Sequence, residues 1–215
     1  MKKSKTLGMV QLALLTALIA VLAFVPYIGY IKIPVLAVQA TTVHIPVIVG
    51  SILLGPKKGA FLGFVFGLTS LINNTTQPGL TSFCFSPFIE LGEGLGGNPL
   101  ALVVCFVPRI LVGVVPGVVY DGLQKLWKNK NKGRKFSLMI SGVAGSMTNT
   151  ILVMSLIYLF FGQAYAAARN IAYEAVLGVI LSVVCINGTL EAIIAGLIAS
   201  AVASAMMRAH LISRN

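Results

Sequence analysis

Five side chains that could recognise a ligand lie within the long apolar runs of this 215-residue sequence. They are Arg109, Glu191 and the asparagines Asn74, Asn149 and Asn187. A guanidinium suits a carboxylate because its planar fork donates two parallel hydrogen bonds. Amides both donate and accept, so they can pair with the amide or hydroxyl groups of a small molecule. The chemistry that these residue types indicate is therefore recognition of a polar, anionic ligand.

Enzymatic chemistry has little support in the sequence. The segment 50–58 resembles a phosphate-binding loop by its two glycines, but Pro56 occupies the position where such a loop needs a lysine. The three cysteines lack the spacing of a metal or redox site, and we expect His44 and His210 on opposite sides of a membrane. We predict no catalytic residue, no metal and no cofactor, and we expect any ATP hydrolysis to occur in a separate chain.

The composition is typical of a membrane protein. Hydrophobic residues make up 57% of the chain and charged residues 10%, whereas soluble domains carry about 25% charged residues. Thirteen of the sixteen Lys and Arg residues lie in four short stretches, at 2–5, 57–58, 125–135 and 208–214. Basic loops of a membrane protein stay in the cytoplasm. The net charge of +11 is spread over segment ends rather than one face, which argues against binding to nucleic acid.

We predict an all-α membrane protein, a single domain over residues 1–215, with six transmembrane helices and both termini in the cytoplasm. A spanning helix needs roughly twenty apolar residues. The apolar runs predict helices at about 7–25, 44–54, 59–73, 99–127, 136–161 and 172–207. Glycines recur every four residues from Gly55 to Gly67, and such a stripe lets helix backbones approach closely in lipid. The segments 27–43 and 75–98 are expected to form outer loops.

The height of each polar residue above the cytoplasmic basic end of its helix can be counted at 1.5 Å per residue. These heights are similar for the polar set: about 21 Å for Asn149, about 24 Å for Arg109 and Asn74, about 25 Å for Glu191 and about 31 Å for Asn187. Ionisable groups at such depth are costly and by default indicate function. Either Arg109 and Glu191 are counter-ions, with the asparagines joining helices, or the set lines a pocket that opens outward. We favour the pocket because four helices supply its residues.

The outer loops could close such a pocket. We expect Gln39 from the first loop and Phe83 from the second to contact the ligand, although anchoring at the membrane interface is an equal explanation for an aromatic residue. Ala13 and Ala17, four residues apart on the first helix, form a small-residue face against which another helix could pack.

Together these features resemble the substrate-binding subunit (S component) of an energy-coupling-factor vitamin transporter. The resemblance covers essentially the whole chain. It is carried by the six helices, by Ala13-xxx-Ala17, by the hairpin His44-Ile-Pro…Gly50-Ser-Ile-Leu-Leu-Gly55-Pro-Lys-Lys-Gly59, which is its most specific part, and by Asn187-Gly-Thr-Leu-Glu191. It implies a high-affinity vitamin receptor in the bacterial plasma membrane. It also implies that Ala13 and Ala17 contact a transmembrane coupling subunit, which two ABC ATPases drive.

The chain is most similar to the pantothenate-type branch, and Arg109 agrees with this because pantothenate is a carboxylate. We expect Arg109 to bind the carboxylate, the three asparagines to contact its amide and hydroxyls, and Glu191 to orient Arg109 or a hydroxyl. The alternative ligands are pyridoxine-like compounds or hydroxymethylpyrimidine, which are neutral heteroaromatics. The alternative of another class is a stand-alone secondary transporter or channel.

Overall fold

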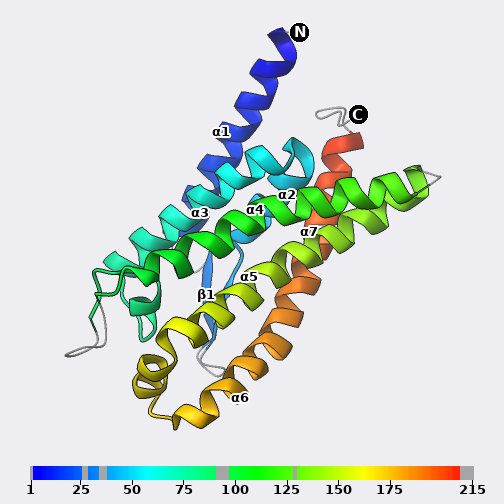
Figure 1. The fold of residues 1–215 in the computed structure, drawn as a ribbon. Coiled ribbons are helices and arrows are strands. Elements are labelled where there is room, and N and C mark those ends of the chain that lie inside the picture. Colours follow the sequence, from blue (N-terminus) through cyan, green and yellow to red (C-terminus); the bar gives the residue numbers. More distant parts are fainter. Residues whose placement is uncertain (1, 26–28, 34–37, 91–96, 128–129, 209–215) are drawn as a thin grey trace.

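The computed structural model describes residues 2–25, 29–33, 38–90, 97–127 and 130–208, without the side chains of 2–5, 30–33, 38–40 and 130–132. Its elements in order are α1 (Lys2–Phe24), β1 (Tyr30–Ile33), β2 (Val38–Thr41), α2 (His44–Leu54), α3 (Pro56–Thr76), the 3-10 turn η2 (Ser82–Cys84), α4 (Leu100–Leu126), α5 (Lys130–Arg169), α6 (Tyr173–Val183), the π-helical turn η3 (Val184–Gly188) and α7 (Thr189–Arg208) (Figure 1). Since α6, η3 and α7 follow one another without a break, the helical segments correspond to the six that we predicted.

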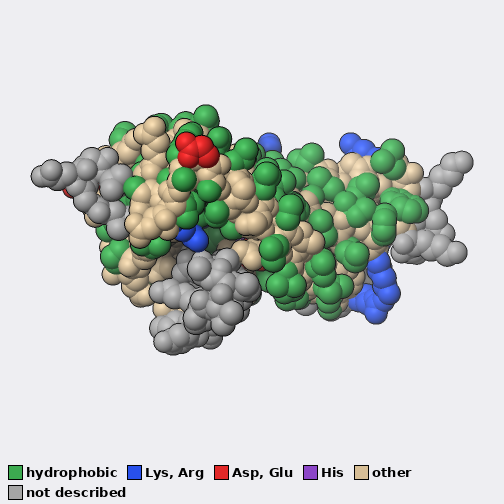
Figure 2. All heavy atoms as spheres, turned by 90° about the horizontal axis from the view of Figure 1, so that it is seen from below, with side chains coloured by type: hydrophobic (Ala, Val, Ile, Leu, Met, Phe, Trp, Pro, Cys, Tyr) green, Lys and Arg blue, Asp and Glu red, His purple; other side chains and the backbone are tan. Residues whose placement is uncertain are grey.

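Four helical stretches in the described part of the chain are long and apolar enough to cross a membrane. They are Thr6–Phe24, Leu100–Leu126, Gly133–Arg169 and Tyr173–Arg208, and the shorter His44–Leu54 is also apolar. Apolar side chains cover much of the surface of the molecule in Figure 2, as lipid contact requires. The chain is therefore a multi-pass membrane protein.

The first predicted outer loop contains a β-hairpin that we did not predict. Strands β1 and β2 pair antiparallel, with Tyr30 opposite Thr41 and Ile33 opposite Val38. Each strand has four residues, which is too short for alternation of apolar and polar residues to be distinctive. The hairpin brings Thr41 to the polar residues of the helices.

The basic ends of the helices lie at one end of the molecule. The start of α1 and the end of α7 lie on the same side in Figure 1, away from the connection between α5 and α6. Lys58, at the start of α3, donates from Nζ to the Gly8 carbonyl of α1 over 3.5 Å. This arrangement agrees with an even number of crossings.

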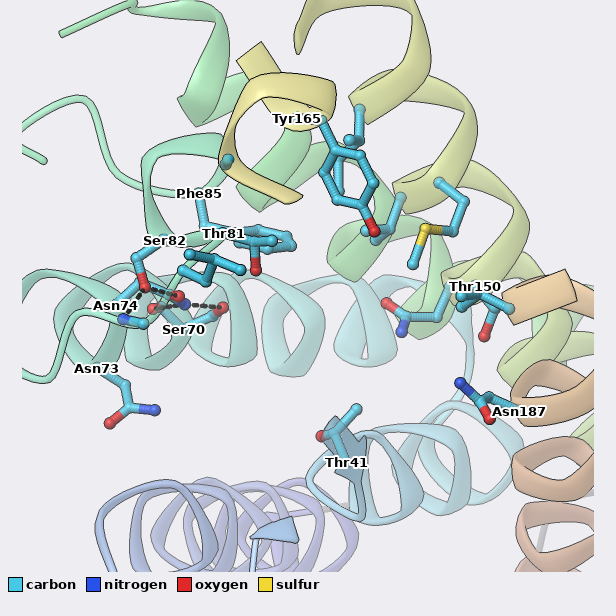
Figure 3. A pocket seen from close by; sticks show the side chains of 18 of the residues that line it. Thr41, Ser70, Asn73, Asn74, Thr81, Ser82, Phe85, Thr150, Tyr165 and Asn187 are labelled. Carbon is cyan, nitrogen blue, oxygen red and sulfur yellow. Dashed lines mark hydrogen bonds between the residues drawn. The ribbon is translucent and has the colours of Figure 1, made fainter. Parts of the chain in front are cut away.

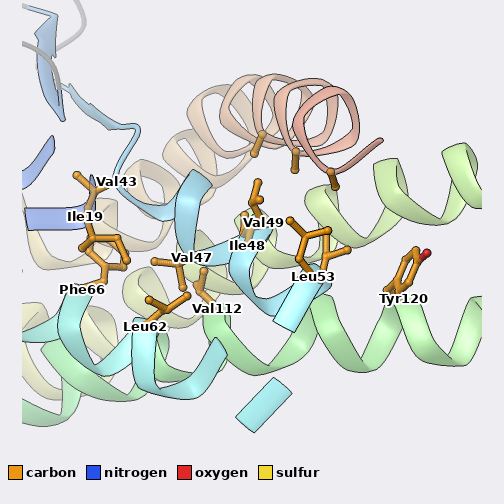
Figure 4. Close-up of a cluster of buried hydrophobic side chains, with 14 of the residues drawn as sticks. Ile19, Val43, Val47, Ile48, Val49, Leu53, Leu62, Phe66, Val112 and Tyr120 are labelled. Atoms are coloured by element: carbon orange, nitrogen blue, oxygen red, sulfur yellow. The ribbon is translucent and has the colours of Figure 1, made fainter. Parts of the chain in front are cut away.

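Helix α2 lies at the centre of the larger buried apolar cluster (Figure 4). Val47, Ile48 and Ile52 of α2 are fully buried there. The turn that follows has Gly55 at φ 94°, a backbone conformation that favours glycine. Pro56 begins α3, where its missing N–H is not needed by the helix. These two residues make the sharp α2–α3 hairpin.

The glycine stripe of α3 packs directly on the backbone of α4. A Cβ at Gly59 would collide with the carbonyl oxygen of Gly113, and a Cβ at Gly63 would collide with the carbonyl oxygen of Arg109. The close approach of α3 and α4 therefore depends on glycine. It occurs at the residue that carries the buried guanidinium.

We predict that Gly63→Ala lowers the stability of the protein in detergent by about 1–3 kcal/mol, because the added methyl group forces α3 away from α4. The matched control is Gly178→Ala on α6, where a Cβ would have no neighbour within 4 Å among the described residues. Thermal unfolding of both variants measures the effect. Equal unfolding midpoints for the two variants would contradict the proposed packing.

Candidate functional site

A cavity of about 840 Å³ lies among α3, η2, α4, α5 and the π-helical turn, and Thr41 of β2 also lines it. Figure 3 shows polar side chains on opposite sides of this space, with Ser70, Asn74 and Ser82 on one side and Thr150 and Asn187 on the other. Such a volume is within the range of small-molecule sites, about 300–1,000 Å³.

The structure brings the polar set of the helices together. Arg109, Asn74, Asn149, Asn187 and Glu191 all line the cavity. The agreement arises because helices of regular rise place residues at a depth that can be counted from their ends.

Arg109 is held by its own helix. Its side chain is 7% exposed, and its Nη1 donates to the carbonyl oxygen of Val104 at 2.9 Å. In a regular helix that carbonyl would accept from the N–H of residue 108, but residue 108 is proline and has no N–H. Pro108 thus leaves the Val104 carbonyl without its usual partner in the helix, and the Arg109 guanidinium donates to it instead.

Two aromatic rings also contact the guanidinium. Its central carbon lies 4.9 Å from the centre of the Phe85 ring and 5.6 Å from that of Phe66. The negative face of an aromatic ring stabilises a cation, more strongly where water is excluded. The guanidinium at the cavity wall is therefore stabilised by two aromatic rings as well as by a backbone carbonyl.

Asn149 lines the cavity and has an acceptor that is buried without a described partner. Its side chain is 7% exposed, and its Oδ1 has no hydrogen-bond partner among the residues that the structure describes. The hydroxyl oxygen of Thr41, on the same cavity, is in the same situation. Buried polar atoms are normally hydrogen-bonded, so these two oxygens suit a ligand that donates hydrogen bonds.

The π-helical turn aligns three residues along the cavity. Val183, Asn187 and Glu191 all line it. In a regular helix, residues eight apart would point about 80° apart, but the one additional residue of a π turn reduces this to about 20°. Oε1 of Glu191 accepts from the backbone N–H of Thr41 at 3.1 Å. This hydrogen bond joins the start of α7 to the β-hairpin.

Asn74 uses both ends of its amide within the protein. Its Nδ2 donates to the Ser70 carbonyl at 2.8 Å, and its Oδ1 accepts from the Ser82 hydroxyl at 2.9 Å. Next to it, the hydroxyls of Thr75 and Ser86 are hydrogen-bonded at 2.8 Å. Asn74 therefore lines the cavity while it fastens the η2 segment to α3.

Of the two aromatic residues around Cys84, it is Phe85 rather than Phe83 that lines the cavity. Phe83 is 1% exposed and packs edge-on against Phe161, with ring centres 6.0 Å apart. Burial raises the pKa of the Cys84 thiol above its ordinary value, so this thiol belongs to the packed layer behind the cavity. The side chain of Gln39 lies outside the described residues.

Arg169 is a cavity residue that lies beyond the predicted end of its helix. It lies at the end of α5, is partly exposed and lines the cavity. Its guanidinium carbon is 5.2 Å from the ring centre of Tyr165, which also lines the cavity. The helix continues eight residues beyond its predicted end at 161, and this extension carries both residues.

The two alanines of α1 face away from the protein. Ala13 and Ala17 are exposed, whereas Ile19 and Ala23 of the same helix are buried. The small-residue face is thus open to lipid or to another protein.

Comparisons with known proteins agree on one family. The model of the family "ECF transporter, substrate-specific component" matches residues 8–203. The chain is 38% identical over 200 residues to the "Pantothenic acid transporter PanT" of Lactococcus lactis subsp. cremoris, covering 90% of this chain and 96% of that one. It is 30% identical over 196 residues to the "Pantothenate transporter PanT" of Leuconostoc mesenteroides subsp. mesenteroides, covering 90% and 88%. The chain therefore belongs to the substrate-specific components of energy-coupling-factor transporters.

Proposed function

We propose that this chain is the pantothenate-binding component of an ATP-driven importer in the bacterial plasma membrane. The basic ends of its helices would face the cytoplasm, so that the cavity takes pantothenate from the outside. A coupling subunit and two ABC ATPases would then supply the energy for import. The names of both relatives support this substrate.

The observation that carries the proposal is the buried guanidinium on the cavity wall. A carboxylate that enters the cavity would form a charge-assisted pair with Arg109 at a site where water screens little. The backbone acceptor of Val104 and the Phe85 ring hold the guanidinium in place before the ligand arrives. Such pre-organisation reduces the entropy lost on binding.

The remaining residues would read the neutral groups of the ligand. Asn149 would accept from the amide N–H or a hydroxyl, since it lines the cavity and its Oδ1 has no partner among the described residues. Asn187 would pair with a hydroxyl. Asn74 would act as a positioning residue, because its amide already bonds Ser70 and Ser82.

Arg109→Gln should weaken pantothenate binding by about 2–5 kcal/mol, because it removes one partner of a buried charge pair. The ligand provides the complementary change, because pantothenol is the alcohol in which a neutral CH2OH group replaces the carboxylate. The wild-type protein should strongly prefer pantothenate to pantothenol, and Arg109→Gln should bind the two with similar affinity. Isothermal calorimetry in detergent measures all four values.

The control for this cycle is Arg208→Gln, at the far end of α7 and exposed. It should keep the wild-type preference. A preference for pantothenate that survives in Arg109→Gln would overturn the assignment of the carboxylate to Arg109. Tight binding of a pyridoxine-like compound or hydroxymethylpyrimidine in place of pantothenate would overturn the substrate.

Pro108→Ala should weaken pantothenate binding by about tenfold without lowering the unfolding midpoint. The restored N–H would donate to the Val104 carbonyl and compete with Arg109 Nη1. The control is Pro116→Ala, which removes the other proline inside α4 two turns away from the guanidinium. If both variants bind with the same affinity, Pro108 has no special part in holding Arg109.

Transport should require partners, whereas binding should not. The purified chain in liposomes should bind pantothenate but accumulate none, and uptake should appear only with the coupling subunit, the ATPases and ATP. Ala13→Trp or Ala17→Trp should abolish that uptake and leave binding intact, while Ala201→Trp, at an exposed position of α7, should leave both unchanged. Uptake by the chain alone that follows an ion gradient would instead indicate a secondary transporter.

A further inference from the structure

We infer that Glu191 is a specificity-determining residue that excludes ligands with a second anionic group, such as the phosphate monoester of the substrate. The inference rests on the proposed function, since it assumes that the carboxylate of the ligand lies at Arg109. The inference concerns the end of the ligand that is distant from the carboxylate.

The buried cation of the cavity, Arg109, lies on the η2 side. The Arg109 guanidinium stands over Phe85, directly after η2. The Arg169 guanidinium stands over Tyr165, which belongs to the same buried cluster as Phe83 and Cys84 of η2. The η2 side of the cavity therefore carries the positive charge of Arg109, and Arg169 adds a second positive charge to the lining.

The carboxylate of the cavity lies on the opposite side. Oε1 of Glu191 accepts from the Thr41 N–H at 3.1 Å, and Glu191 follows Asn187 by four residues in the continuous helix of η3 and α7. Figure 3 shows Thr150 and Asn187 across the cavity from Phe85. Among the described lining residues the charges are two arginines and one glutamate, so the site has a positive side, a negative side and a net charge of +1.

Pantothenate matches this layout in one orientation. Its carboxylate is at one end, and a primary hydroxyl is at the other, beyond the amide and a second hydroxyl. With the carboxylate on the η2 side, the primary hydroxyl points toward Glu191 and Asn187 and can donate to the carboxylate. A phosphate in place of that hydroxyl would bring about two negative charges beside a third.

Like charges that meet in a poorly screened site oppose binding strongly, and this is a common means of rejecting a wrong ligand. The selection would have a consequence for the cell: the importer takes up only the free alcohol. Phosphorylation of the hydroxyl after import would make the product unable to rebind from the cytoplasmic side.

The test compares pantothenate with its phosphate monoester at the primary hydroxyl, by calorimetry on the full chain in detergent. The wild-type protein should bind the ester at least about 100-fold more weakly. Glu191→Gln keeps the size and shape of the side chain, so it separates the effect of charge from steric exclusion. In this variant the ratio of the dissociation constants of the ester and pantothenate should fall about tenfold or more. Asn187→Asp adds a negative charge one turn away and should widen the ratio.

Equal affinity of the wild-type protein for both compounds overturns the inference. So does a ratio that stays the same in Glu191→Gln, since exclusion would then be steric. If Glu191→Gln does not fold, as judged by its unfolding midpoint, the Asn187→Asp variant decides alone, and an unchanged ratio there also overturns it. Failure of the wild-type protein to bind pantothenate at all is a different outcome, which rejects the proposed function.

Discussion

The whole arrangement depends on how one positive charge is kept inside an apolar, membrane-spanning bundle. The cost of burying Arg109 is offset by the Val104 carbonyl that Pro108 leaves available and by the rings of Phe66 and Phe85. Helices α3 and α4 also pack closely at this residue, because Gly63 lets the backbone of α3 approach the Arg109 carbonyl. The close packing of α3 on α4 and the proposed ligand contact of Arg109 thus share the same turn of α4.

The other polar groups reach the cavity by departures from regular helices. The π-helical turn orients Asn187 and Glu191 in the direction of Val183, and the β-hairpin brings the Thr41 N–H to Glu191. The hydrogen bonds of Asn74 fix the segment that carries Phe85. Around this polar interior, the outer faces of the helices remain apolar, so one short chain is both a lipid-facing bundle and a candidate receptor.

The sequence predicts the helices and most of the cavity wall well, because hydropathy and the constant rise of a helix are local properties. It does not predict the β-hairpin or the π turn, whose register depends on contacts with distant elements. Phe83 and Phe85 are two residues apart in a loop, and only the packing with Phe161 shows that Phe83 is buried and Phe85 lines the cavity. Arg169 is not predicted as a cavity residue, because it lies outside the helix predicted at 136–161, where a charged residue usually indicates only contact with water.

A crystal structure of the chain with pantothenate bound would show directly whether Arg109 holds the carboxylate. We expect the ligand carboxylate within about 3 Å of the Arg109 guanidinium and the primary hydroxyl on the side of Glu191. A ligand seated in the reverse direction, or one whose carboxylate contacts Arg169 while Arg109 stays on Val104 and the aromatic rings alone, would contradict this expectation.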